Sequence, residues 1–270
     1  MQEKRLERQG PVAQQVCIGS QIFEADGLFF DKDGPLVDFK YQYTKLMDKR
    51  IELILSKFSK NKLKLHRAIC RSIGYDARAG LIDPCGPFAM ATRGETLTIV
   101  AHALYQHGPP WDQASSIVTQ AFLGADQHFK LEDLIKRTDG LSSILSAFQE
   151  SGLILACLTN DDGKRARAIL DYLEISSYFK LIIGGDEVTR PKPDPEIFQK
   201  ACQQLSLNPR RVAFFGDTVS DMVMAKKAGA GLAVGILAGG TSTRSVLQEA
   251  AHLVIDSLKD VSILYHPRSV

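Results

Sequence analysis

Two carboxylates stand one residue apart at the end of an apolar segment, within the run from Gly27 to Gly34. A carboxylate at the end of a strand can attack phosphorus and form an acyl phosphate, which makes Asp31 a candidate nucleophile. A second carboxyl group, Asp33, can protonate a leaving oxygen and later take a proton from water. Gly34 lets the backbone bend sharply after the pair. The run therefore predicts chemistry at a phosphate group.

Three further polar clusters follow later apolar segments, and each supplies a different part of a phosphate site. Thr159 offers a hydroxyl and Asn160 a backbone amide to phosphate oxygens, while Lys192, between two prolines, offers a fixed positive charge. Asp217 and Asp221 add carboxylate oxygens, the ligand type that a hard cation such as Mg²⁺ prefers. Alone, each cluster is compatible with an ordinary turn, loop or helix start. Together, in order after four strands, they predict phosphoryl transfer.

Short apolar segments alternate with segments of helical spacing from Leu141 onward. This alternation predicts an α/β fold with a doubly wound, mostly parallel, Rossmann-like sheet. In such a sheet the carboxyl ends of the strands lie along one edge, where ligands bind. The four polar clusters, although far apart in sequence, are therefore expected to converge there. The predicted strands are 27–30, 153–158, 181–183, 212–215, 232–236 and 252–255, and the predicted helices are 141–150, 163–173, 195–205, 220–228 and 241–250.

The segment 39–138 differs from the rest because it shows helical periodicity and no convincing strand. It lies between the first predicted strand and the remainder of the sheet. We therefore predict an all-helical cap domain over 39–138, inserted into a discontinuous catalytic core of residues 1–38 and 139–270. A hairpin over 16–23, with Gly19 and Ser20 as its turn, is predicted before the first strand. The predicted helices of the cap are 41–58, 63–73, 92–107 and 111–122.

The composition excludes several classes of partner. The 270 residues carry a net charge of +2, which gives no electrostatic footprint for nucleic acid. No run approaches the roughly 18 apolar residues needed to span a bilayer, and the charged start over 1–9 does not lead into a signal peptide. Five scattered cysteines without metal-ligand spacing favour free thiols and a cytoplasmic location. We expect no nucleic-acid or membrane partner, and the sequence does not separate a monomer from a homodimer.

These residues, in this order, resemble the haloacid dehalogenase superfamily. Its pattern is an Asp-x-Asp-Gly-x-Leu opening, a Ser or Thr, a Lys and a terminal acidic pair. The resemblance covers 27–38 and 153–237, and the insert is similar in position to the helical cap of phosphoglycolate phosphatase-like members. It implies a Mg²⁺-dependent phosphatase that acts on a small phosphorylated metabolite through an aspartyl-phosphate intermediate.

The resemblance also implies a role for each acidic residue. Asp31 would be the nucleophile, Asp33 the general acid and base, and Lys192 the charge partner of both nucleophile and phosphate. Mg²⁺ would be bound by Asp31, the backbone carbonyl of Asp33 and Asp217, with Asp221 as a ligand or a support for the ligands. The true dehalogenases lack the second aspartate, so Asp33 indicates phosphate rather than halide chemistry.

Pro35 departs from the superfamily pattern, which usually has threonine at this position. Proline removes a backbone donor and a hydroxyl that can steady the loop. We expect reduced tuning but not lost activity, because none of the expected phosphate or metal contacts comes from this side chain. Two alternatives stay open: a phosphomutase of the same superfamily, and a catalytically silent binding or regulatory protein that keeps the fold.

Two arginines of the insert, Arg78 and Arg93, lie in a stretch broken by glycine and proline that could overhang the site. One of them could pair with a substrate carboxylate. A surface salt bridge is the more common role for an arginine in such a position.

Overall fold

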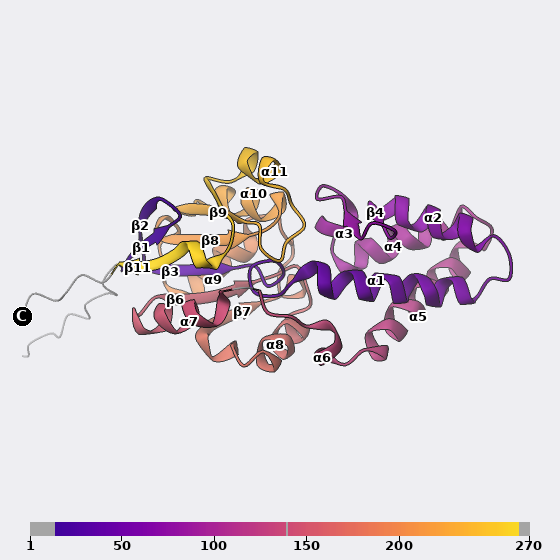
Figure 1. Cartoon of the computed structure of the whole chain (residues 1–270), viewed down its shortest axis with the longest axis horizontal. Coiled ribbons are helices and arrows are strands. Elements are labelled where there is room, and N and C mark those ends of the chain that lie inside the picture. The colour runs from indigo at the N-terminus through magenta and orange to yellow at the C-terminus, as the bar shows by residue number, and fades with distance from the viewer. Residues whose placement is uncertain (1–13, 139, 265–270) are drawn as a thin grey trace, which may run out of the picture.

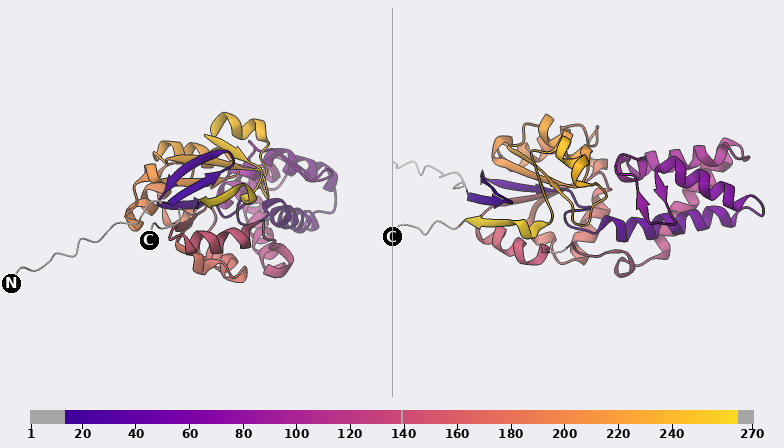
Figure 2. Two further views of the ribbon diagram at one scale, coloured as in Figure 1. Left: turned by 60° about the vertical axis from the view of Figure 1, so that its left-hand side comes forward. Right: turned by 45° about the horizontal axis from the view of Figure 1, so that its top comes forward.

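The computed structural model describes residues 14–138 and 140–264. The charged start over 1–9 and the predicted boundary residue Asp139 lie outside the described residues. The chain forms two bodies in a row, an α/β core and a block of helices at one end of it (Figures 1 and 2). This block, residues 39–134, is called the helical insert below.

Six strands form a fully parallel sheet in the core, in the order β10-β9-β8-β3-β6-β7. β3 pairs with β6 on one side and β8 on the other. The chain fills one half of the sheet outward to β7 and then returns to β8. The strand order therefore reverses beside β3, where α/β sheets bind ligands, and the predicted doubly wound fold is confirmed. The strands are β3 (Gly27–Phe30), β6 (Ile154–Leu158), β7 (Phe179–Ile183), β8 (Val212–Gly216), β9 (Leu232–Ile236) and β10 (Leu253–Ile255).

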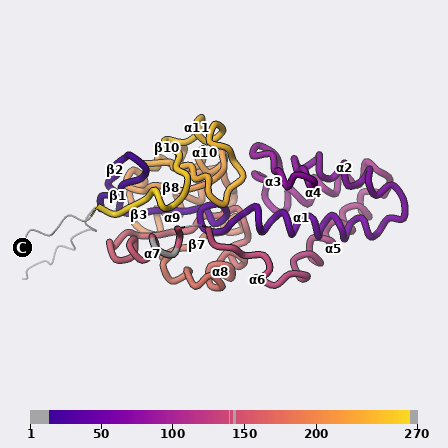
Figure 3. Tube along the Cα trace, in the orientation of Figure 1, coloured from indigo at the N-terminus to yellow at the C-terminus, as the bar shows by residue number. Residues whose placement is uncertain are grey.

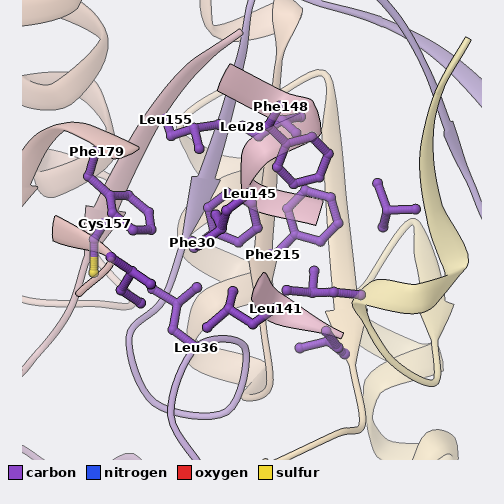
Figure 4. Close-up of a cluster of buried hydrophobic side chains, with 14 of the residues drawn as sticks. Leu28, Phe30, Leu36, Leu141, Leu145, Phe148, Leu155, Cys157, Phe179 and Phe215 are labelled. Atoms are coloured by element: carbon purple, nitrogen blue, oxygen red, sulfur yellow. The ribbon is translucent and has the colours of Figure 1, made fainter. Parts of the chain in front are cut away.

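Hydrophobic layers cover both faces of this sheet. In β3, Leu28 and Phe30 point into the layer with α7 and α8, whereas Phe29 points into the layer with α9, α10 and α11. The ring of Phe30 stacks on Phe215 with centroids 4.9 Å apart, and Phe148 of α7 packs beside it (Figure 4). Burial on both faces explains why the strands read as nearly continuous apolar runs. The helices are α7 (Leu141–Glu150), α8 (Gly163–Tyr172), α9 (Glu196–Leu205), α10 (Val219–Lys227) and α11 (Arg244–Ala250).

A second, antiparallel sheet closes the end of the core farthest from the helical insert (Figure 1). β1 (Gln14–Ile18) and β2 (Gln21–Ala25) form the predicted hairpin, with Gly19 at a φ of 58° in its turn. β11 (Val261–Leu264) pairs with β1 on the other side and is absent from the sequence prediction. Its four residues alternate between buried positions and positions that are exposed or partly exposed, and this pattern is too short to predict a strand.

The helical insert has its own hydrophobic core, which includes Met47, Ile51 and Phe122. α1 leads away from the sheet, and α5 and α6 bring the chain back (Figure 3). β4 (Tyr75–Asp76) and β5 (Leu81–Ile82) pair within the insert, so the expectation of an insert without strands is wrong on this point. Strands of two residues carry no readable alternation. The helices are α1 (Phe39–Ser56), α2 (Lys62–Ile73), α3 (Pro87–Met90), α4 (Arg93–Tyr105), α5 (Trp111–His128) and α6 (Leu131–Leu134).

The remaining predicted elements agree with the structure to within a few residues. The largest difference is in α5, which ends at His128 where the sequence predicts an end at 122. None of the helices within residues 14–138 and 140–264 combines the length and the apolar character that crossing a bilayer requires.

Candidate active site

The loop after β3 carries Asp31 and Asp33 to the edge of the sheet that faces the helical insert. The amide of Asp31 donates to the carbonyl of Phe215 at 2.8 Å, which extends the β3–β8 pairing up to the carboxylate. Gly34 then turns the chain with a φ of 86°. A Cβ on Gly34 would lie 2.5 Å from Cγ of Asp217. Both the backbone conformation and the lack of space require glycine here.

Lys192 joins two carboxylates from different strand ends. Its Nζ lies 2.9 Å from Oδ1 of Asp31 and 2.7 Å from Oδ1 of Asp221, and it donates to the carbonyl of Leu158 at 3.2 Å. Burial acts to lower the pKa of Lys192, but Asp221 and Asp31 outweigh it and raise the pKa above its ordinary value. The lysine is therefore a permanent positive charge beside the candidate nucleophile.

The loop that carries Lys192 is held by the side chain of Asn160. Oδ1 of Asn160 accepts from the backbone amide of Lys192 at 3.0 Å, and Nδ2 donates to the carbonyl of Lys192 at 3.2 Å. The neighbouring Thr159 is buried, and its Oγ1 accepts from the amide of Asp161 at 3.1 Å. The sequence assigns Asn160 a backbone contact to phosphate. The structure adds a second role for its side chain, which fixes the lysine loop.

Three carboxylates meet at this edge of the sheet. Asp31, Asp217 and Asp221 each place one oxygen within 4.8 Å of the other two. Burial raises the pKa of Asp31 to about 7 against the opposing effect of Lys192. Burial and the charge of Asp221 raise the pKa of Asp217 well above its usual range. Buried acids crowded in this way favour a bound cation, which would stabilise their charged forms.

The donor set fits a hard divalent cation, since carboxylate oxygens are its preferred ligands. Oδ1 of Asp221 accepts from Lys192, and its Oδ2 accepts from the amide and hydroxyl of Thr218 in the capping box that starts α10. Oδ2 of Asp217 accepts from the amide of Thr241 at 3.1 Å. Asp31 and Asp217 are therefore the better placed ligands. Asp221 holds both the lysine and the start of the helix.

Asp33 lies in a network that sequence reasoning missed. Nζ of Lys32 lies 2.7 Å from Oδ1 of Asp33 and 3.2 Å from Oδ2 of Asp161. The hydroxyl of Tyr43, on α1, donates to Oδ2 of both Asp33 and Asp161 at 3.3 Å. Burial raises the pKa of Asp33, although Lys32 opposes the shift. The position of Lys32 between two candidate catalytic aspartates is the one sequence feature that points to this network. No pattern in the sequence indicates Asp161 or Tyr43.

Pro35 fits the loop without leaving a hydrogen bond unmade. The turn is closed by the amides of Leu36 and Val37, which donate to the carbonyl of Lys32, and by the amide of Gly34, which donates to Val37. None of these bonds needs a donor at position 35. The expectation that proline reduces tuning without abolishing activity stays a prediction, and this geometry is compatible with it.

A pocket lies between the edge of the sheet and the helical insert, and it is called the active-site pocket below. It is lined by the candidate catalytic residues and by the segment Phe88 to Arg93 of the insert. Arg93 lines it, whereas Arg78 is not among its lining residues. All seven residues predicted for the site line it or lie beside it: Asp31, Asp33, Thr159, Asn160, Lys192 and Asp217 in the wall, and Asp221 in contact with Lys192.

The fold and the site together define an α/β enzyme whose acidic strand ends face a helical insert. The chain belongs to the haloacid dehalogenase-like hydrolases, because residues 25–229 match this family. It is 29% identical over 241 residues to phosphoglycolate phosphatase 1 of Pseudomonas aeruginosa, which covers 87% of this chain and 77% of that protein.

A second relative is similar in sequence, and a solved structure is similar in fold. A protein of Pseudomonas putida named "probable phosphoglycolate phosphatase" is 29% identical over 166 residues, which is 54% of this chain and 65% of that protein. A β-phosphoglucomutase from Clostridium difficile has a TM-score of 0.56 at 19% identity, covering 86% of this chain and 91% of that one. At this identity the solved structure shows the fold alone.

Proposed function

We propose that the protein is a Mg²⁺-dependent phosphatase that hydrolyses a small phosphomonoester through an aspartyl-phosphate on Asp31. The observation that carries the proposal is the position of Lys192, whose Nζ lies 2.9 Å from Asp31 and 2.7 Å from Asp221, beside Asp217. One edge of the sheet thus gathers a nucleophile, a fixed cation and metal-binding oxygens. The names of the relatives support a small phosphorylated metabolite as the substrate.

In the first step, a carboxylate oxygen of Asp31 attacks the phosphorus, and the bond from phosphorus to the ester oxygen breaks. Asp33 gives its proton to the leaving oxygen, so that the alcohol departs neutral. Burial raises the pKa of Asp33, which favours the protonated form that this step needs. Lys192, the hydroxyl of Thr159 and the amide of Asn160 would stabilise the charge on the phosphate oxygens.

In the second step, water attacks the phosphorus of the aspartyl-phosphate. Asp33, now a carboxylate, takes a proton from the water, and the bond between phosphorus and Asp31 breaks. Inorganic phosphate leaves and Asp31 is regenerated as a carboxylate. Asp33 therefore serves both half-reactions, which explains why its position is fixed by Lys32 and Tyr43.

Asp31 and Asp217 would hold the Mg²⁺ ion, with the backbone carbonyl of Asp33 as a third ligand and Asp221 in support. When bound, the ion offsets the repulsion between the nucleophile and the phosphate.

The helical insert would act as a cap. We place the cap at residues 39–138 and the catalytic core at 1–38 and 139–270. Closure over the active-site pocket would exclude bulk water and select the substrate. The five free cysteines support a cytoplasmic location for the enzyme, as a monomer or homodimer.

The test is phosphate release from p-nitrophenyl phosphate and a panel of phosphorylated metabolites, with Mg²⁺ and after chelation by EDTA. We expect metal-dependent, steady release that falls on the order of 10⁴-fold or more in Asp31→Asn. Asp171→Asn, an exposed aspartate on α8, is the matched control. Steady release without an acceptor separates the hydrolase from a phosphomutase. An Asp31→Asn variant with normal activity would refute the assignment, and no release from any substrate would support a silent binding protein.

A further inference from the structure

Three arginines that line the active-site pocket converge on one carboxylate, that of Asp126. Arg50 of α1, Arg93 at the start of α4 and Arg165 of α8 all line the pocket. Asp126 of α5 lies 3.2 Å from Nη2 of Arg50, 2.6 Å from Nη2 of Arg93 and 3.7 Å from Nη1 of Arg165. Two of these arginines come from the helical insert and one from the core, so the cluster spans both walls of the pocket.

Positive charge exceeds negative charge in this cluster. Among the ion pairs of the described residues, Asp126 is the only acid that faces Arg50 and Arg93. Arg165 has a second acidic neighbour in Asp161, at 3.5 Å, but Asp161 is also the partner of Lys32. Burial lowers the pKa of Arg50, Asp126 opposes this, and the charge of Arg93 lowers it further. The cluster as a whole is therefore short of negative charge.

Within the described part of the chain, each arginine of this cluster has one buried nitrogen without a hydrogen-bond partner: Nε of Arg50, Nη1 of Arg93 and Nε of Arg165. Arg50 is only 5% exposed, so water does not readily replace the missing acceptor. Its guanidinium lies over the ring of Phe122, with Cζ 4.2 Å from the centroid. The guanidinium of Arg93 lies over the same ring, with Cζ 5.4 Å from the centroid, and pairs with Asp126. The donors are held in place and lack an acceptor.

We propose that Arg50, Arg93 and Arg165 bind a second anionic group of the substrate, so that the substrate is a phosphomonoester carrying a carboxylate or a second phosphate. The inference rests on the proposed phosphatase function, because it assumes that the first phosphate lies at Asp31. Guanidinium groups offer parallel donors that match the oxygens of carboxylate and phosphate. Asp126 orients the arginines but cannot satisfy all their donors.

The experiment compares substrates that differ only in the second group. Phosphoglycolate is paired with 2-hydroxyethyl phosphate, and 1,3-propanediol bisphosphate with 3-hydroxypropyl phosphate. We expect the wild-type enzyme to prefer the anionic member of at least one pair by about tenfold to a hundredfold in kcat/KM. The pair that shows the preference identifies the second group as carboxylate or phosphate.

Arg50→Gln and Arg93→Gln should each lower this preference by about tenfold. Arg71→Gln, an exposed arginine on α2 of the same insert, should leave the preference at its wild-type value. Arg93→Lys keeps the charge but not the paired donors, and should restore part of the preference. If Arg50→Gln does not fold, Arg93→Gln carries the test, since its side chain is 37% exposed.

The outcomes separate the two proposals. If the wild-type enzyme releases phosphate from none of the four compounds or the wider panel, the phosphatase function fails. If it hydrolyses the anionic and neutral members of each pair equally well, the function stands and the second-anion site is refuted. If Arg93→Gln slows both members of a pair to the same extent, the arginines only join insert and core, and the proposal is again overturned.

Discussion

The two walls of the active-site pocket carry charge excesses of opposite sign. At the edge of the sheet, Asp31, Asp217 and Asp221 cluster, and Lys192, which pairs with Asp31 and Asp221, is the one cation that the ion pairs of the described residues place against them. Across the pocket, Arg50, Arg93 and Arg165 all pair with Asp126, and among the described ion pairs only Arg165 has a second acidic partner, Asp161. The first wall is short of positive charge and the second is short of negative charge. A metal ion and a substrate anion would offset the two imbalances, one on each wall.

The opposite charge excesses of the two walls predict how each wall responds when one of its charged residues is replaced. Removing the one counter-ion of a wall leaves several like charges together in a poorly hydrated place, which is costly. Removing one of the charges in excess relieves repulsion and costs less. Substitutions of the shared residue should therefore affect folding, whereas substitutions of the residues in excess should affect ligand binding.

The largest effect is expected from Lys192→Met, because Lys192 is the one cation that the described residues pair with the acidic wall. We expect a loss of about 3–5 kcal/mol in the free energy of unfolding, since a buried pair is broken from one side. Activity should fall on the order of 10³-fold or more, because the charge beside the nucleophile is lost. Chemical denaturation and phosphate release measure the two effects. Lys180→Met, which replaces an exposed lysine on β7, is the control. Normal stability of Lys192→Met would contradict the claim that the shared residue of each wall is needed for folding.

The acidic wall was predictable from the sequence for a physical reason. Asp31, Thr159 and Asp217 directly follow strands, and a parallel sheet brings strand ends to one edge without any knowledge of side-chain packing. The family match and the sheet order confirm that fold. The roles of the seven predicted site residues stay predictions, although the structure brings the residues together.

The basic wall was not predictable in the same way. Arg50, Arg93 and Asp126 lie on three different helices, and their meeting depends on how those helices pack. Of these, only Arg93 stood out in the sequence, because it lies in a broken stretch of the insert. Lys32 was missed because the apolar pattern of the preceding strand does not show in which direction the side chain of a loop residue points. The pairing of β11 with β1 was missed because it joins the two ends of the described chain.

The next largest effect is expected from Lys32→Met, at the border between the two walls. Lys32 is fully buried between Asp33 and Asp161, so its loss should lower the free energy of unfolding by about 3 kcal/mol. We expect kcat to fall by about tenfold to a hundredfold, because Asp33 loses the contact that positions it for both half-reactions. Steady-state kinetics should show little change in KM. A rise in KM at constant kcat would instead assign Lys32 to substrate binding, and Lys32→Arg should keep part of the activity.

A smaller effect is expected from Asp126→Asn, which removes the carboxylate that pairs with all three arginines of the basic wall. The three arginines would then repel one another, and we expect a loss of about 2 kcal/mol in the free energy of unfolding. Added sulfate should restore more stability to this variant than to the wild-type protein, because the anion takes the place of the carboxylate. Thermal unfolding in sulfate and in chloride at equal ionic strength measures the difference. If the variant gains no more stability from sulfate than the wild-type protein does, sulfate does not take the place of the Asp126 carboxylate.

The smallest effect is expected from Thr92→Ala, which removes the N-cap of α4 but none of the charged groups of either wall. The hydroxyl oxygen of Thr92 accepts from the amide of Glu95, and the backbone amide of Thr92 donates to the carboxylate of Glu95. Loss of the hydroxyl should cost about 1 kcal/mol. The cost should fall on the helical insert, where hydrogen exchange at the start of α4 should become faster while β3 and β8 keep their protection. Because Arg93 follows directly, the preference for an anionic substrate should weaken by a few-fold. Thr92→Ser keeps the cap and should behave like the wild-type protein. Faster exchange spread equally over core and insert would contradict this prediction. It would mean that the insert opens only together with the sheet, so the two walls would not be stabilised independently.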